Sequence, residues 1–303
     1  MSKCKCSLLV LGAGVLWGAT GLFFRQLTAM GLNSPEIVLL RISFAALFLA
    51  AVLLWKDPKL FCIRWRQLPM LMGAGVCAFL AFFCYFSALS NTTMAVACIL
   101  LYTAPGFVVI LSALLFKERI TWRKAMALVL IFGGSVFSSG FFDTSQSITW
   151  GGLLWGVLSG LSYALYSVFS RFSLSRGCSG FTVSFYAMAF GAMVALCMVD
   201  LPTMAVKLTL PMLGWGMGIG GICAMLPFLL YTLGMNGMDT GEASMLSTVE
   251  LVVAALLGVA VLSEPMTGFV TFGVVLILAG IGVMNVKLSF ARKTDATMAE
   301  QQL

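Results

Sequence analysis

Histidine is absent from this chain, and charged residues make up only 10% of it. Without histidine, the chain lacks the commonest general base and the commonest metal ligand. Soluble domains carry about 25% charged residues, so the composition requires lipid as a solvent instead. A phosphate-binding glycine loop ending in Gly-Lys-Ser or Gly-Lys-Thr is also missing, which excludes ATP hydrolysis within the chain. We therefore expect a protein that is not an enzyme, with no catalytic residues, no metal and no cofactor.

Most of the chain consists of apolar residues, which occur in long runs. Apolar residues account for 61% of the chain, and the mean hydropathy is +1.04. The nine cysteines form no disulfide or zinc spacing, so we interpret them as packing residues or free thiols. The net charge of +7 comes from short basic clusters beside apolar runs, where lipid headgroups and topology explain it better than a nucleic-acid partner. These features predict an all-α membrane protein.

Windows of about 20 apolar residues predict ten membrane-spanning helices. The first window follows Lys3 and Lys5 as a signal peptide would, but it lacks a convincing cleavage site and is long enough to cross a bilayer. We therefore expect it to be retained as the first helix. The ten predicted spans are 8–29, 35–55, 68–90, 93–116, 122–141, 151–173, 179–200, 211–235, 241–262 and 267–286.

Basic residues predict the orientation of these spans, because Lys and Arg in short loops stay in the cytoplasm. With the N-terminus inside, every Lys and Arg outside the spans falls on the cytoplasmic side except Lys207. Arg25 and Arg41 lie within spans. We expect a multi-pass protein of a bacterial-type inner (plasma) membrane with both termini in the cytoplasm.

The chain is also a duplication, because a shift of 146 positions aligns it with itself without a gap. We divide it into a first repeat at 1–146, a second repeat at 147–288 and a cytoplasmic tail at 289–303. Each repeat holds five predicted spans, and an odd number inserts the second copy upside down. The expected architecture is ten helices in two inverted five-helix repeats. Aligned pairs include Arg25 with Arg171, Tyr85 with Tyr231, Glu118 with Glu264 and Gly134 with Gly280.

Ionisable residues within the spans are informative, since a charge in the hydrocarbon region needs a partner or water. Arg25 lies close to the end of the first span and is interpreted as an interfacial anchor, so Glu250 and Arg41 are the main candidates for substrate binding. Glu250 falls near the middle of the ninth span, where it could bind a substrate amine, carry a proton or serve as a structural partner to an arginine. Arg41 falls in the second span, where its guanidinium could hold a substrate carboxylate or only brace helices.

Three aromatic residues, Trp17, Tyr102 and Tyr163, also fall at mid-depth, although Trp and Tyr prefer the membrane interface. The duplication pairs Trp17 with Tyr163, and it pairs Ala104 with Glu250. These positions converge on the axis between inverted halves, which predicts a substrate cavity with aromatic walls and one carboxylate. Helix packing is the alternative explanation for each aromatic residue taken alone.

Four further residues are candidates for gating or for lining the cavity. Tyr85 and Tyr231 fall nearer opposite ends of their spans, where they could line gates or act as interfacial anchors. Pro105 and Pro227 interrupt the fourth and eighth spans and free backbone carbonyls, which could line a cavity or only accompany a kink.

Several short motifs follow one another in an order that resembles a known family, the EamA-type members of the drug/metabolite transporter superfamily. The resemblance covers nearly the whole chain and implies ten helices, two inverted repeats, a central cavity and transport of small metabolites without ATP. One departure is visible: the family often has Glu followed by Pro in the ninth helix, whereas Leu251 follows Glu250 here. The motifs are Leu16-Trp-Gly-Ala19, Leu40-Arg41, Tyr102-Thr-Ala-Pro105, Phe116-Lys-Glu-Arg119, Ile131-Phe-Gly-Gly134, Ser244 to Glu250, Leu262-Ser-Glu-Pro265 and Leu276-Ile-Leu-Ala-Gly280.

The leading hypothesis is a secondary transporter that exports small organic metabolites, amino acids or related compounds, by alternating access. The alternatives are an importer of a vitamin, nucleoside or sugar derivative, and a non-transporting membrane assembly partner or a passive channel. The expected partners are a small-molecule substrate and the lipid bilayer, with no nucleic acid. Coupling to protons or other ions and the oligomeric state stay open.

Overall fold

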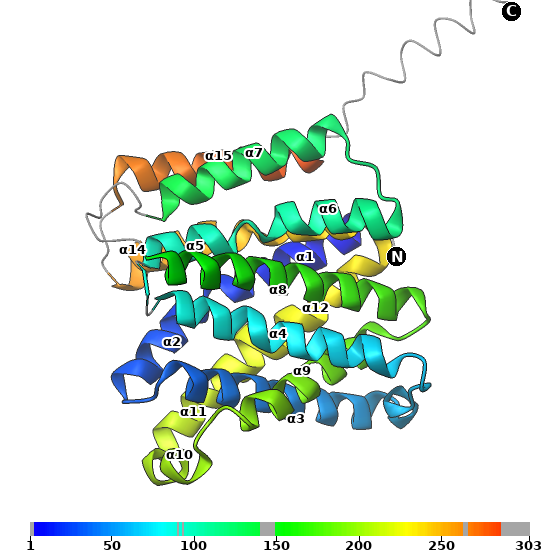
Figure 1. Cartoon of the computed structure of the whole chain (residues 1–303), viewed down its shortest axis with the longest axis vertical. Helices are drawn as coiled ribbons and strands as arrows, with labels where there is room; N and C mark the ends of the chain where they lie inside the picture. Colours follow the sequence, from blue (N-terminus) through cyan, green and yellow to red (C-terminus); the bar gives the residue numbers. More distant parts are fainter. Residues whose placement is uncertain (1–2, 90, 93, 140–148, 263–265, 286–303) are drawn as a thin grey trace, which may run out of the picture.

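The computed structural model describes residues 3–89, 91–92, 94–139, 149–262 and 266–285. The regular secondary structure of these residues is helical, and none of them forms a strand. The helices lie side by side in stacked layers, with α7 and α15 together at one edge of the molecule and α3, α10 and α11 toward the other (Figure 1). The tail predicted at 289–303 and the Glu264 position of the repeat alignment lie outside the described residues.

Within its described residues, the first repeat contains seven α-helices and one short 3₁₀ helix. They are α1 (Lys3–Gly18), α2 (Thr20–Ala29), α3 (Ser34–Lys56), η1 (Pro58–Phe61), α4 (Leu68–Leu89), α5 (Met94–Leu101), α6 (Ala104–Phe116) and α7 (Trp122–Ser138).

The second repeat follows the same order, with additional breaks. Its elements are α8 (Trp150–Ser175), α9 (Gly180–Leu196), α10 (Leu201–Lys207), α11 (Leu210–Gly220), the π-helical turn η3 (Gly221–Met225), α12 (Leu226–Gly234), the 3₁₀ turn η4 (Met235–Gly237), α13 (Thr240–Ser247), α14 (Val249–Leu262) and α15 (Gly268–Asn285).

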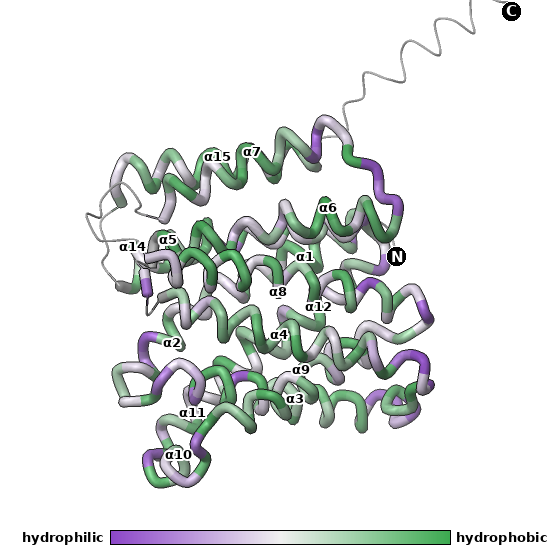
Figure 2. The backbone as a smooth tube through the Cα atoms, in the orientation of Figure 1, coloured by the Kyte–Doolittle hydropathy of each residue, from purple (hydrophilic) through white to green (hydrophobic). Residues whose placement is uncertain are grey.

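Seven helical stretches in the described residues are long and apolar enough to cross a membrane, or eight if α9 and α10, which meet at 100°, count as one span. The fifth and tenth predicted spans correspond to α7 and α15, with 17 and 18 residues. At 1.5 Å per residue these helices are only about 26 and 27 Å long, slightly less than a bilayer core of about 30 Å. Figure 2 shows apolar residues along the helices and hydrophilic residues mainly at helix ends and loops. The structure is thus a multi-pass membrane fold.

Local sequence explains where α3 begins. The Asn33 side chain accepts a hydrogen bond from the Glu36 N–H at 3.0 Å, and the Glu36 carboxylate accepts one from the Asn33 N–H at 2.8 Å. Pro35 occupies the first turn, where its missing N–H costs nothing. This reciprocal cap satisfies two amide groups that the helix leaves open. It fixes the N-terminal end of the helix that carries Arg41.

Packing between the helices follows the duplication. The first span, α1, packs against α12, α13 and α14, while its counterpart α8 packs against α4, α5 and α6. The last helices, α7 and α15, pack against each other through a reciprocal contact. A Cβ at Gly134 would lie 2.7 Å from the Ile277 side chain, and one at Gly280 would lie 2.9 Å from the Ile131 side chain. These two glycines and two isoleucines are repeat-equivalent, so the same contact occurs twice.

Candidate functional site

Two spans are broken in their middle at equivalent places. Helices α5 and α6 are separated at Tyr102 and Thr103, and helices α13 and α14 are separated at Thr248. Tyr102 and Thr248 are 146 positions apart, so the breaks coincide in the repeat alignment. Half-helices that end at mid-depth present free backbone groups, and this arrangement is typical of substrate sites in transporters built from repeats.

Different residues cause the two breaks. In the first repeat, Pro105 has no N–H for the carbonyl four residues earlier, and the Thr103 hydroxyl donates to the Leu100 carbonyl at 2.6 Å. In the second repeat, Ser247 and Thr248 donate to carbonyls three residues earlier, at 2.8 and 2.6 Å. Such side-chain bonds compete with helical hydrogen bonds. The ninth span is therefore interrupted without the proline that the family resemblance would supply.

Glu250 lies in the first turn of α14, directly after the break. Its side chain is half-buried, so it keeps accessible surface although it lies in the middle of a span. The N-terminal end of a helix carries a partial positive charge, which favours a carboxylate there. The carboxyl group interacts with the Tyr102 hydroxyl at the other break, and it lies within electrostatic range of the Arg41 guanidinium.

Arg41 is positioned by the interruption of the eighth span. Pro227 has no N–H for the carbonyl of Cys223, which lies four residues earlier in the π-helical turn η3. The Arg41 Nη2 atom donates to this carbonyl at 2.8 Å, and the guanidinium carbon lies 4.0 Å from the centre of the Phe82 ring. The sequence predicts that Pro227 frees a backbone carbonyl, and in the structure Arg41 binds the carbonyl at this position, that of Cys223.

Arg41 and Glu250 approach each other without direct contact. Within the described residues no ion pair joins them, although each contributes to the electrostatic environment of the other. The side chain of Arg41 is only 3% exposed, and its Nε–H has no hydrogen-bond partner. A buried N–H without a partner is costly, and sites of this kind are often completed by a ligand or water.

Three of the aromatic candidates, Trp17, Tyr163 and Tyr231, form one cluster. The Trp17 ring centre lies 6.2 Å from that of Tyr163 and 5.5 Å from that of Tyr231. Tyr231 is fully buried and its hydroxyl lies 3.0 Å from that of Ser167, which argues against an interfacial anchor at this position. Trp17 is also buried, and its indole Nε1 has no partner. The Tyr163 hydroxyl contacts Ser247 at 3.4 Å, which joins this cluster to the break beside Glu250.

Tyr85 and Cys98 extend the site along the first repeat. The Tyr85 hydroxyl lies 3.1 Å from the Cys98 sulfur, and both groups are within electrostatic range of Glu250. The sequence singled out Tyr85 but not Cys98. Cys98 lies one helical turn before Tyr102, and this spacing is the only sequence signal for its position.

Close backbone contacts hold the first helix of each repeat against the break in the other repeat. A Cβ at Gly14 would lie 2.7 Å from the Ser247 carbonyl oxygen, and one at Gly160 would lie 3.2 Å from the Leu101 carbonyl oxygen. Gly14 and Gly160 are repeat-equivalent, as are Ser247 and Leu101. Only glycine permits this approach, which places Trp17 and Tyr163 beside the broken helices.

Metal-ligating side chains do not gather in groups of three or more within the residues that the structure describes. The chemistry available at the site is instead that of one guanidinium, one carboxylate, several hydroxyl groups and aromatic faces. This set can bind an organic molecule through charge, hydrogen bonds and ring contacts.

Known proteins are similar to this chain in sequence and in fold. An uncharacterized transporter of Archaeoglobus fulgidus is 30% identical over 90% of this chain and 93% of its own length. The pseudopaline exporter CntI of Pseudomonas aeruginosa is 31% identical over 54% of this chain and 56% of its own length. A solved crystal structure with 22% identity superposes with a TM-score of 0.80 over 94% of this chain and 97% of that chain, which shows a shared fold.

The model of the EamA-like transporter family matches the chain twice, at residues 5–140 and 150–286. The two matches cover both repeats recognised by the 146-residue shift. The chain therefore belongs to the EamA-like transporter family.

Proposed function

We propose that this transporter exports small zwitterionic metabolites, amino acids or related compounds, by alternating access through the site between Arg41 and Glu250. The observation that carries the proposal is the placement of one buried cation and one carboxylate within electrostatic range but out of contact. A molecule with its own carboxylate and amine would satisfy both groups at once. Trp17, Tyr102 and Tyr163 would then contact the rest of the substrate.

The same proposal includes ten spans in two inverted repeats. The coincident breaks at Tyr102 and Thr248 support it, as do the repeated contacts of α1 and α8 with the breaks in the opposite repeat. Five spans in each repeat would thread the two copies through the bilayer in opposite directions. One central site could then open to either side as the halves exchange conformations.

Direction and orientation are supported by separate observations. Basic residues outside the spans favour cytoplasmic termini, with Lys207 alone on the outer side. A relative that matches just over half of the chain is named an exporter. The chain has no nucleotide-binding loop, so uphill export requires an ion gradient, substrate exchange or a partner protein, with a proton carried on Glu250 as one route.

The first experiment is a thermal-shift screen of the purified protein with L-amino acids, polyamines, nucleosides and vitamins at a common concentration. A ligand of the folded state raises the melting temperature by mass action. We expect at least one amino acid to stabilise the wild-type protein. The Glu250→Gln variant, which loses the negative charge, should bind the same amino acid at least about tenfold more weakly.

Proteoliposomes loaded with the stabilising amino acid test export itself, because release should require the protein and saturate with substrate. Non-saturating release would indicate a channel. If a nucleoside or vitamin stabilises the protein and no amino acid does, the proposed substrate class is wrong. Glu250→Gln with unchanged binding and flux would remove that carboxylate from the mechanism.

A further inference from the structure

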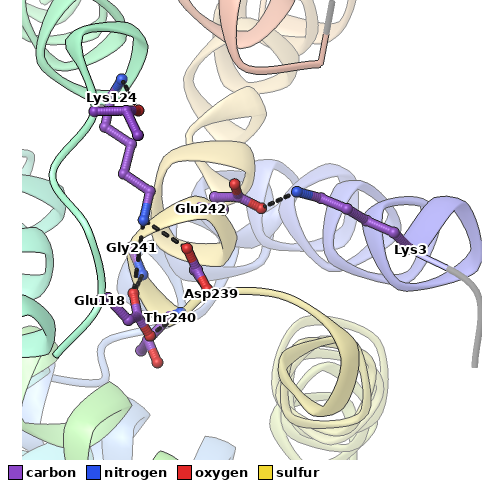
Figure 3. A network of polar contacts seen from close by, with 8 residues as sticks. Lys3, Glu118, Lys124, Asp239, Thr240, Gly241 and Glu242 are labelled. Atoms are coloured by element: carbon purple, nitrogen blue, oxygen red, sulfur yellow. Dashed lines mark hydrogen bonds and ion pairs between the residues drawn. The ribbon is translucent and has the colours of Figure 1, made fainter. Parts of the chain in front are cut away.

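A network of charged residues holds the N-terminal end of the half-helix α13 to the first repeat. The Glu118 carboxylate accepts hydrogen bonds from the N–H groups of Thr240 at 2.9 Å and Gly241 at 3.4 Å (Figure 3). The Lys124 ammonium lies 2.7 Å from the Asp239 carboxylate and 3.9 Å from that of Glu118. Lys3 on α1 pairs with Glu242 at 2.7 Å.

The network caps the N-terminus of α13, because α13 has no side-chain N-cap of its own. Asp239 is at the N-cap position but makes no side-chain cap bond, so Glu118 supplies the missing acceptor from another helix. The side chains of Glu118 and Lys124 are only 9% and 5% exposed. Removing one partner would leave a charge buried without compensation, which is strongly unfavourable.

The half-helix α13 lies between this network and the substrate site. It starts at Thr240, within the network, and ends at Ser247, beside the break that precedes Glu250. It also packs against α1 and α6, the helices that lead to Lys3 and Glu118. A movement of α13 away from these helices would therefore expose the site from this end of the bundle, which we assign to the cytoplasm.

The repeat alignment shows that the opposite end lacks the same charges. Glu118 keeps a counterpart, Glu264, but its partners do not. The positions equivalent to Lys124, Asp239, Glu242 and Lys3 are Val270, Thr93, Val96 and Thr149. Two identical halves would give inward-facing and outward-facing states of equal free energy. Ion pairs that are not repeated at the equivalent positions make the two states unequal.

We propose that Glu118, Lys124, Asp239 and Glu242 form a cytoplasmic gate latch, whose one-sided charges favour the state that is closed to the cytoplasm. This inference depends on the proposed inverted repeats and alternating access. It gives a function to the motif Phe116-Lys-Glu-Arg119, which lies outside the substrate site. An exporter with such a latch would rest outward-facing, and opening to the cytoplasm would require the ion pairs of α13 to separate.

Labelling of Cys98 tests the latch, because this half-buried thiol lies within electrostatic range of Glu250. Inside-out vesicles containing the full-length protein are treated with a membrane-impermeant maleimide, and peptide mass spectrometry measures modification of Cys98. We expect slow labelling in the wild type and at least about fivefold faster labelling in Lys124→Gln, because Glu118 and Asp239 then lose their shared cation. In right-side-out vesicles the same variant should label more slowly than the wild type.

Lys207→Gln is the matched control, since it removes the ion pair with Glu36 (3.1 Å) at the other end of the bundle. It should leave labelling from the cytoplasmic side unchanged. Asp239→Asn is a milder second variant if Lys124→Gln does not fold. Equal Cys98 labelling in folded latch variants and wild type would overturn the latch. A wild type that no amino acid stabilises, but whose labelling responds to Lys124→Gln, would count against the proposed substrate and leave the latch supported.

Discussion

At the residue scale, Arg41 has two features that suit it to a substrate carboxylate. One edge of its guanidinium is fixed by the Cys223 carbonyl, and its face lies over Phe82. The Nε–H is buried and has no partner. Arginine presents several donors in one plane, so it can keep its backbone bond and still bind a ligand. A purely structural brace would be expected to use all of its buried donors.

The Arg41→Lys substitution separates these two explanations. Lysine keeps the charge but has a single ammonium group, which cannot hold the Cys223 carbonyl and a carboxylate from two edges. We expect binding of the stabilising amino acid to weaken about tenfold, or about 1.4 kcal/mol. Titration by thermal shift would measure this, with the melting temperature of the ligand-free variant as the folding control. Unchanged affinity would indicate that Arg41 only braces the helices.

The sequence alone predicted Glu250 and Arg41 as candidates, because charges are rare in apolar runs and costly in lipid. Their proximity could not be predicted in the same way, since it depends on how α3 and α14 are placed by other helices. Cys98 is a clearer example of a contact that the sequence does not predict. A cysteine within an apolar run is an ordinary packing residue, and only the fold places its sulfur next to Tyr85.

At the element scale, the two broken spans differ in how clearly the sequence signals the break. The break before α6 is signalled by Pro105, a residue that cannot continue the helical hydrogen bonds. The break before α14 has no such residue, and it results from hydroxyl groups of Ser247 and Thr248 that bind local carbonyls. Ser and Thr often occur in membrane helices without breaking them, so this interruption could not be predicted from its own local residues.

The contact of α1 with α14 gives a test at this scale. A methyl group at Gly18 would lie 2.6 Å from the Val253 Cβ and 2.9 Å from the Glu250 carbonyl oxygen, whereas one at Gly21 would have no neighbour within 4 Å. We expect Gly18→Ala to destabilise the protein by about 1–3 kcal/mol through overpacking. Gly21→Ala is the matched control and should change stability by no more than about 1 kcal/mol.

Melting temperatures of the two glycine variants in the same detergent measure the difference. A clear decrease for Gly18→Ala with little change for Gly21→Ala is the expected result. Equal melting temperatures would show that α1 and α14 separate easily, and the positions of Trp17 and Glu250 relative to each other would then be less fixed than the structure indicates.

At the scale of the whole molecule, the duplication was the strongest signal in the sequence. A gapless shift of 146 positions predicted that α5–α6 and α13–α14 are equivalent, and their breaks fall at equivalent residues. It also pairs Gly134 with Gly280, which make reciprocal contacts between α7 and α15. Repeat alignment succeeded because it compares whole elements, so it does not depend on the propensity of any single residue.

The opposite threading of the two repeats is the central claim, and native and introduced thiols test it directly. Cys62 is exposed after the second predicted span, and Ala205 is exposed in α10, which follows the equivalent span of the second repeat. An impermeant maleimide applied to intact cells producing Ala205→Cys should label residue 205 but modify Cys62 only after permeabilisation. Labelling of both positions in intact cells, or of neither until permeabilisation, would contradict the account.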